Sequence, residues 1–152
     1  MKYLSTLFIA IALLAVGTLQ AQNASKLNSQ SYTYMMKKAD GTGPEIIDKM
    51  TFGIGEASSE ELAKSGFSKT SVKENNAGAL SDFELVFKKS DGSKYFYKGK
   101  AEGVEFHGTL TKTEANGAQT EMLFRGLLTE EWNHILEQKA IQRAKVAKEN
   151  QN

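Results

Sequence analysis

The sequence predicts an all-β domain, an up-and-down antiparallel barrel or strongly coiled sheet, followed by one C-terminal α-helix. Three observations predict it. Glycine-containing turns divide residues 81–128 into four strands, and apolar residues alternate with polar ones along each strand. Opposite charges meet across the expected outer face. The last segment, residues 129–152, changes to the spacing of an amphipathic helix.

The chain begins with a segment that we expect to lie outside this domain. A positive Lys2 precedes an apolar run over residues 7–16, and the small Ala21 precedes a cleavage point. This is the layout of a secretory signal peptide, and the apolar run is short for a membrane span. We therefore expect residues 1–21 to be removed, with an uncleaved anchor as the alternative, and the protein to be periplasmic or secreted. Residues 22–29 are polar and predict a flexible N-terminus.

Composition excludes several classes of function. The mature chain of about 131 residues has the size of one domain with a core of its own. Its acidic and basic residues balance to a net charge near zero, so nucleic acid is a poor candidate partner. The chain has no cysteine, which excludes disulfides, a lipid-modified cysteine and a cysteine nucleophile.

The barrel is expected over residues 30–128, and its first part is the least regular. Alternating apolar residues predict three strands before residue 81: residues 32–37, 46–54 and 67–73. Ser58 followed by Glu61 has the spacing of a capping box, which predicts a short helix or turn over residues 58–64. With the four later strands this makes about seven, and an eighth could lie in the loop around Pro44.

Three turns set the pairing of the later strands. Residues 90–92 and residues 115–117 each form a three-residue loop ending in glycine, which enters the left-handed region at little steric cost. Residues 102–103 are expected to form a two-residue turn. Folding the strands about these turns places one apolar face inward, made of Phe83, Leu85, Phe87, Tyr95, Tyr97, Gly99, Ala101, Val104, Phe106, Gly108, Leu110, Met122, Phe124, Gly126 and Leu128.

The opposite face carries charges that match across strands. Asp82 is expected opposite Lys100, which then faces Glu105 on the next strand. Glu84 is expected opposite Lys98. Opposite charges on neighbouring strands are the usual pairing on a solvated face. The charges therefore support the register independently of the turns.

Three glycines interrupt the apolar face, Gly99, Gly108 and Gly126, and each is expected beneath an aromatic ring of a neighbouring strand. Glycine inside a strand suits a sharply bent sheet that closes on itself. Alternating large and small residues is how a small barrel fills its interior, and it can leave room for a ligand.

The C-terminal segment predicts a helix that docks through its first half and frays in its second. Thr129 can cap the helix, and its apolar stripe comprises Trp132, Ile135, Leu136 and Ala140. An apolar row on the outer sheet face offers a docking place: Val86, Phe96 and Leu123, interrupted by Thr109. We expect Trp132 and Leu136 to cover this row, because such a patch would otherwise be exposed.

The spacing of Phe52, Gly55, Ser59, Gly66 and Phe67 resembles a motif in a family of small exported bacterial proteins of unknown function that have lipocalin-like barrels. Later residues also resemble that family's closing strands: Tyr97-Lys98-Gly99, Gly103, Gly108-Thr109 and Phe124-Arg125-Gly126-Leu127-Leu128. The resemblance covers roughly residues 49–128 and implies a lipocalin-like barrel.

The chain departs from that family's pattern at three places. Ala57 stands where the family usually has an aromatic residue, and Leu62 stands where it usually has a cysteine. A tryptophan that is common near Tyr97 is also replaced. The resemblance implies no catalytic residue, and any role tied to the cysteine is absent.

No catalytic or metal-binding constellation is apparent in the sequence. His107 is expected beside Arg125 on the charged face and His134 on the polar side of the terminal helix, and neither has a second ligand at metal spacing. The adjacent carboxylates at residues 60–61 and 130–131 fit helix starts, and no serine sits in a Gly-x-Ser-x-Gly turn. We therefore expect a protein that is not an enzyme and needs no cofactor or metal.

The inward aromatic side chains form the candidate ligand site: Phe83, Phe87, Tyr95, Tyr97, Phe106 and Phe124. Two interpretations fit them, a filled core and a cavity for a small apolar or amphipathic molecule that the tyrosine hydroxyls would orient. The leading function is therefore an exported, non-enzymatic binding protein for such a ligand. The alternative is an envelope interaction or structural module that uses the outer sheet face or the terminal helix. Membrane contact is not expected, because the basic end of the helix carries only alanine and valine on its apolar face.

Overall fold

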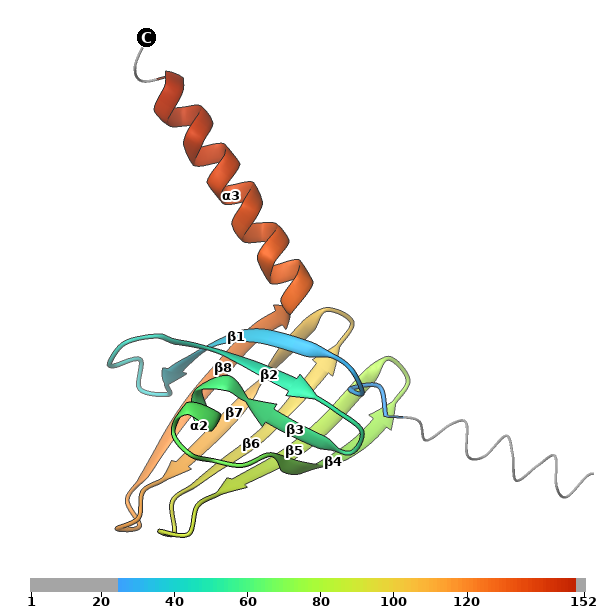
Figure 1. Cartoon of the computed structure of the whole chain (residues 1–152), viewed down its shortest axis with the longest axis vertical. Coiled ribbons are helices and arrows are strands. Elements are labelled where there is room, and N and C mark those ends of the chain that lie inside the picture. The colour runs from blue at the N-terminus through green and yellow to red at the C-terminus, as the bar shows by residue number, and fades with distance from the viewer. Residues whose placement is uncertain (1–24, 150–152) are drawn as a thin grey trace, which may run out of the picture.

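Eight strands close into a barrel, and one long helix follows the last strand (Figure 1). The structure is a computed structural model that describes residues 25–149. The strands are β1 (Ser31–Lys38), β2 (Ile46–Phe52), β3 (Glu56–Ser59), β4 (Thr70–Ala77), β5 (Leu80–Lys88), β6 (Lys94–Glu102), β7 (Glu105–Thr113) and β8 (Gln119–Leu128), and the helices are α2 (Glu60–Lys64) and α3 (Thr129–Glu149). Each strand pairs antiparallel with the next, and β1 also pairs with β8. The expected fold class is confirmed.

The ends of the chain lie outside this description. The expected signal peptide and the first part of the expected flexible segment fall within residues 1–24, which the structure does not describe. Neither of the described helices combines the length and the hydropathy that crossing a bilayer requires.

Two of the three expected turns are confirmed. The backbone N–H of Lys89 donates to the carbonyl of Ser93 at 2.9 Å, closing the loop in which Gly92 has a φ of +89°. The loop before β8 repeats this geometry, and Gly117 has a φ of +86°. A three-residue loop with a left-handed last residue therefore joins both hairpins. It also places Met122 inward, as expected.

The turn between β6 and β7 was expected one residue too early along the chain. Glu102 lies opposite Glu105, so the turn residues are Gly103 and Val104. Gly103 has a φ of +57°, which puts the left-handed residue at the first turn position, where glycine favours a type II′ turn. Val104 is 42% exposed and leaves the apolar face. As a result Lys100 lies opposite His107, and the expected pairing of Lys100 with Glu105 is wrong.

The corrected register brings two of the interior glycines together. Gly99 lies opposite Phe83 on one side and Gly108 on the other. A Cβ atom on Gly99 would lie 2.6 Å from Cζ of Phe83 and 2.7 Å from Cζ of Phe124. The rings of neighbouring strands therefore occupy the space that a side chain at position 99 would need.

The eighth strand is β3, which pairs with β2 and β4. It was expected near Pro44, but residues 39–47 are exposed, and the proline cannot donate a ladder hydrogen bond. The N-cap of α2 is Ser59 rather than Ser58, because its Oγ accepts from the N–H of Leu62 at 3.0 Å. Ser58 instead pairs with Thr51 in the sheet.

The strand expected over residues 67–73 begins later and runs further. Phe67 lies before β4 and is only 8% exposed, because its ring packs against Tyr95 with ring centroids 5.1 Å apart. β4 continues to Ala77, beyond residue 73, where the strand was expected to end. Its polar residues remain in the sheet because Thr70 and Ser71 pair with β3 and residues 72–77 pair with β5.

Candidate functional site

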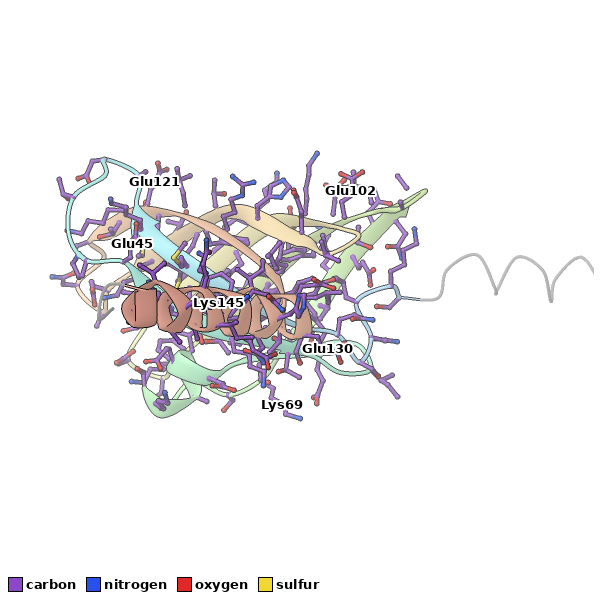
Figure 2. All side chains as sticks on the ribbon, turned by 90° about the horizontal axis from the view of Figure 1, so that it is seen from above. Glu45, Lys69, Glu102, Glu121, Glu130 and Lys145 are labelled. Carbon is purple, nitrogen blue, oxygen red and sulfur yellow. The ribbon has the colours of Figure 1, made fainter. Side chains whose placement is uncertain are left out.

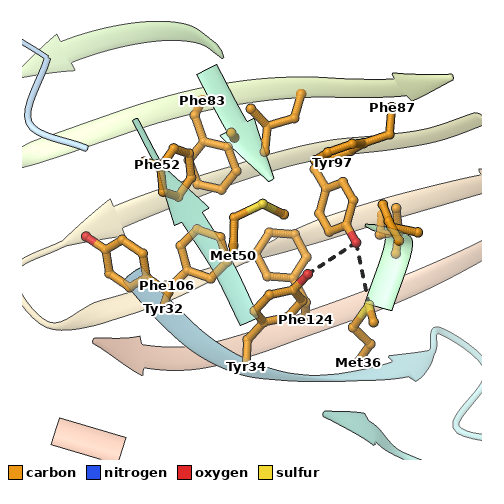
Figure 3. Packing of buried hydrophobic residues seen from close by; sticks show 14 of the residues in the cluster. Tyr32, Tyr34, Met36, Met50, Phe52, Phe83, Phe87, Tyr97, Phe106 and Phe124 are labelled. Atoms are coloured by element: carbon orange, nitrogen blue, oxygen red, sulfur yellow. Dashed lines mark hydrogen bonds between the residues drawn. The ribbon is translucent and has the colours of Figure 1, made fainter. Parts of the chain in front are cut away.

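Five of the six aromatic side chains expected to line a ligand site belong to the buried core: Phe83, Phe87, Tyr97, Phe106 and Phe124 (Figure 3). The Phe106 ring stacks on Phe83 at 5.1 Å with an interplanar angle of 3°, and on Tyr32 at 4.7 Å with an angle of 16°. Phe52 meets the stack edge-on, 6.1 Å from Phe106. Ring pairs at these distances are in direct contact. This part of the interior is therefore filled by side chains.

The two expected tyrosines differ in burial. Tyr97 is fully buried, and its hydroxyl lies 3.2 Å from the hydroxyl of Tyr34 and 3.8 Å from the sulfur of Met36 (Figure 3). Tyr95 is half-buried beside Phe67, at the edge of the core. Tyr97 is therefore part of the buried core, whereas Tyr95 packs against its edge.

A buried carboxylate, which was not among the expected site residues, lies next to this tyrosine pair. Asp48 is 4% exposed, and its Oδ2 accepts from the hydroxyls of Tyr34 and Ser59, each at 2.6 Å. Its Oδ1 accepts from the backbone N–H groups of Lys49 at 2.6 Å and Glu61 at 3.0 Å. Four donors satisfy both oxygens, as a buried carboxylate requires.

Burial changes the acidity of the phenols in this cluster. Burial raises the pKa of the Tyr34 hydroxyl well above its ordinary value, and the neighbouring Tyr97 and Asp48 raise it further. Burial likewise raises the pKa of Tyr97, although its hydrogen bond with Tyr34 acts in the opposite direction. Both phenols are therefore neutral donors at physiological pH. Tyr34 donates to Asp48, and the hydroxyls of Tyr34 and Tyr97 lie within hydrogen-bond distance of each other.

The Asp48 cluster ties three parts of the chain together. Tyr34 comes from β1, Asp48 from β2, and Ser59 from the end of β3, where it also caps α2. The alternation of Asp48 with the inward Met50 and Phe52 was the available signal that the carboxylate points inward. The cluster holds the short helix against the barrel, and its geometry is that of a structural support.

The outer face carries a ladder of ion pairs. Lys73 and Lys98 approach Glu84 at 3.1 Å and 3.9 Å, and Lys100 approaches Asp82 at 3.8 Å. These residues line an open groove of about 770 Å³ over β4–β7. Figure 2 shows charged side chains such as Lys69, Glu102 and Glu121 spread around the barrel. Five of the twelve residues that line the groove form ion pairs, and its lining also includes Phe83, Gly99 and Gly108.

The structure does not assemble the expected docking row. Val86 lies opposite Phe96, but the shifted register puts Thr111 next in that row and moves Leu123 one row away, opposite Thr109. Leu123 is 53% exposed, so the helix does not cover it.

Helix α3 departs from the end of the barrel instead of folding back over the sheet (Figure 1). It contacts β8 and β1, and the hydroxyl of Thr33 donates to that of Thr129 at 3.1 Å. Trp132 is half-buried near this junction, whereas Leu136 is 53% exposed. Trp132 and Leu136 therefore do not meet Val86, Phe96 or Leu123.

The two histidines take ordinary positions. His107 lies between Lys100 and Arg125 on the outer face, and His134 is exposed on α3. Among the described residues, no three histidine, aspartate or glutamate side chains are grouped so that they could hold a metal ion.

Comparisons with protein-family models, curated proteins and solved structures found no match. The closed eight-stranded barrel with its C-terminal helix is compatible with a lipocalin-like architecture.

Proposed function

We propose that this protein is an exported, non-enzymatic interaction module in which the barrel is a rigid base and α3 is the contact element. The observation that carries the proposal is the course of α3, which leaves the end of the barrel (Figure 1). Several apolar side chains of this helix are exposed. Export rests on the pattern of residues 1–21.

The barrel interior favours a supporting role over a carrier role. Among the aromatic residues expected to bind a ligand, Phe83, Phe87, Tyr97, Phe106 and Phe124 are each at most 2% exposed. They pack on one another and on the β1 tyrosines, and an apolar ligand in their midst would have to displace rings that already make close contacts.

The exposed helix favours a protein partner. α3 has 21 residues, and four of its apolar side chains are 39–53% exposed: Ile135, Leu136, Ile141 and Val146. A helix gains most of its stability from packing an apolar face, and an isolated helix is marginal in water. Pairing with another helix would cover those apolar side chains that share one face of α3.

The order of charges along α3 favours a second copy of this chain in antiparallel orientation. The first half carries Glu130, Glu131 and Glu137 without lysine or arginine, and the second half carries mainly basic residues: Lys139, Arg143, Lys145 and Lys148. A parallel pair would set like charges together, whereas a two-fold antiparallel pair sets acidic halves against basic halves. In a single helix the dipole also favours acidic residues in the first half and basic residues in the second. A single helix, however, leaves the apolar side chains uncovered.

The contact face can be named from helix geometry. At about 100° per residue, Trp132, Leu136 and Val146 lie within about 80° of one another. Ile141 lies about 140° from Leu136, on the other side of the helix. Since Leu136 and Ile141 are similarly exposed, at 53% and 46%, the second is a matched control for the first.

The test is sedimentation equilibrium of the mature chain and of two single variants. The wild-type chain and Ile141→Gln are expected to form dimers of equal affinity, and Leu136→Gln is expected to weaken the dimer about tenfold or more, because each pair loses two buried leucines. A wild-type chain that stays monomeric at every concentration, or two variants that behave alike, would contradict the proposal.

A further inference from the structure

One pair of lysines on the outer face departs from the charge pattern around it. Lys88, at the end of β5, lies directly opposite Lys94, at the start of β6, and both are exposed. Like charges directly opposite each other destabilise a sheet. The other outer-face lysines on these strands, Lys98 and Lys100, pair with carboxylates. Neither Lys88 nor Lys94 forms an ion pair with any residue that the structure describes.

The next residue in the same row is also unsatisfied. Thr113 of β7 lies opposite Lys94 and is only 8% exposed. Its hydroxyl is buried and has no hydrogen-bond partner within the described part of the chain. Buried hydroxyls usually have a partner, and leaving one without costs stability. One row across β5, β6 and β7 thus holds two lysines directly opposite each other and, beside them, a buried hydroxyl without a partner among the described residues.

A groove of about 360 Å³ lies over these positions. Its lining contains no carboxylate and consists of Val86, Lys88, Lys94, Phe96, Thr111, Thr113 and Gln119. Val86 and Phe96 lie opposite each other in the neighbouring row and supply an apolar wall. Glu121, the carboxylate closest by register, lies opposite Thr111 and is not part of the lining.

We infer that this groove binds a small organic anion, a carboxylate or phosphate monoester that carries an aryl or alkyl group. The two ammonium groups supply charge-assisted hydrogen bonds to the anion, and Thr113 and Gln119 supply neutral donors. The apolar part of the ligand lies against Phe96 and Val86. A solvated lysine pair alone would be unremarkable at a hairpin end, but it would leave the adjacent hydroxyl without a partner. One bound anion satisfies all three side chains.

The test uses phenyl phosphate as the probe, with amide chemical shifts of the mature protein as the readout. Saturable shifts are expected at Lys88, Lys94 and Thr113. The variant K88Q/K94Q is expected to bind at least about tenfold more weakly, because two charge-assisted contacts are lost. The matched control K98Q/K100Q removes the same charge from the same face and is expected to bind within about twofold of wild type.

A third variant separates a binding role from a structural one. Thr113→Val keeps the shape and removes the buried hydroxyl, so it is expected to raise the melting temperature of the free protein while weakening phenyl phosphate binding. Inorganic phosphate is expected to bind more weakly than phenyl phosphate, because it makes no contact with Phe96. Equal losses in both double variants, an absence of saturable shifts, equal binding of the two phosphates, or binding only to phosphatidylglycerol vesicles would each overturn the inference.

Discussion

Tyr34 donates a 2.6 Å hydrogen bond to Asp48, and both side chains are buried. The bond joins β1 to β2, and Asp48 also receives the hydroxyl of Ser59, which caps α2. One acidic side chain therefore links the first two strands to the short helix that follows the third.

Removing that carboxylate is expected to destabilise the fold strongly. Asp48→Ala leaves the hydroxyls of Tyr34 and Ser59 and the N–H of Glu61 without their acceptor, so we expect a loss of roughly 3 kcal/mol or more in unfolding free energy from urea titration. The control is Asp82→Ala, which removes a half-exposed carboxylate paired with Lys100 and should cost less than about 1 kcal/mol. Equal losses in the two variants would show that the buried cluster has no special structural role.

Stability is expected to fall in alkaline solution because of the buried tyrosines. The folded-state pKa values of Tyr34 and Tyr97 are raised above the ordinary value of 10.0, so the fold favours the neutral phenols. Their contribution is fully present below pH 10.0 and is lost as pH rises from there through the folded-state pKa values.

The measurement is the denaturant midpoint as a function of pH, for wild type and for Tyr34→Phe/Tyr97→Phe. The double variant should be less stable at neutral pH, because Asp48 loses a donor, and its stability should fall less steeply above about pH 10. Parallel pH profiles for the two proteins would refute the assignment of this dependence to the buried phenols.

Adding one methyl group inside the sheet is expected to disturb the core. In Gly99→Ala the new Cβ would meet Phe83 at 2.6 Å and the backbone carbonyl of His107 at 2.8 Å, which forces rings and a strand to move. We expect a loss of about 1–3 kcal/mol. Gly53→Ala is the control, because the nearest atom is the flexible Cγ of Glu56 at 3.4 Å. Thermal melts that fall equally for both variants would contradict this packing argument.

The sequence could predict the hairpins whose turns and charges agree. The three-residue loops ending at Gly92 and Gly117 follow from glycine chemistry, and Asp82 does lie opposite Lys100 as its charge predicts. The turn after β6 was misplaced because moving it by one residue shifts the pairing by two. Apart from Val104, which enters the turn, that shift leaves the inward side chains of β6 and β7 inward, so alternation cannot detect it.

The same shift explains the failed docking row. Leu123 aligns with Val86 and Phe96 only in the expected register, which is wrong. The three residues therefore do not form the continuous apolar row that α3 was expected to cover. The course of α3 depends on contacts at the end of the barrel, including Thr33 with Thr129, which lie far apart in the sequence. The spacing of residues along the chain does not predict contacts between segments this far apart.

The sequence predicts which side chains lie in the interior, but it does not predict whether those side chains leave a cavity. The six candidate aromatic side chains do point inward or lie at the core edge, as alternation predicts. Whether they leave a cavity depends on side chains from β1 and β2, such as Tyr32, Tyr34 and Phe52, which complete the ring contacts. Pairing of those strands could not be derived, because they lack the turn signals of the later hairpins.

The most direct test of the proposed role of α3 is amide hydrogen exchange of the mature protein over a range of concentrations. If α3 pairs with a second copy, protection over residues 135–147 should rise with concentration, while protection of the barrel strands stays constant. Protection in α3 that is the same at every concentration would contradict self-pairing as the function of this helix.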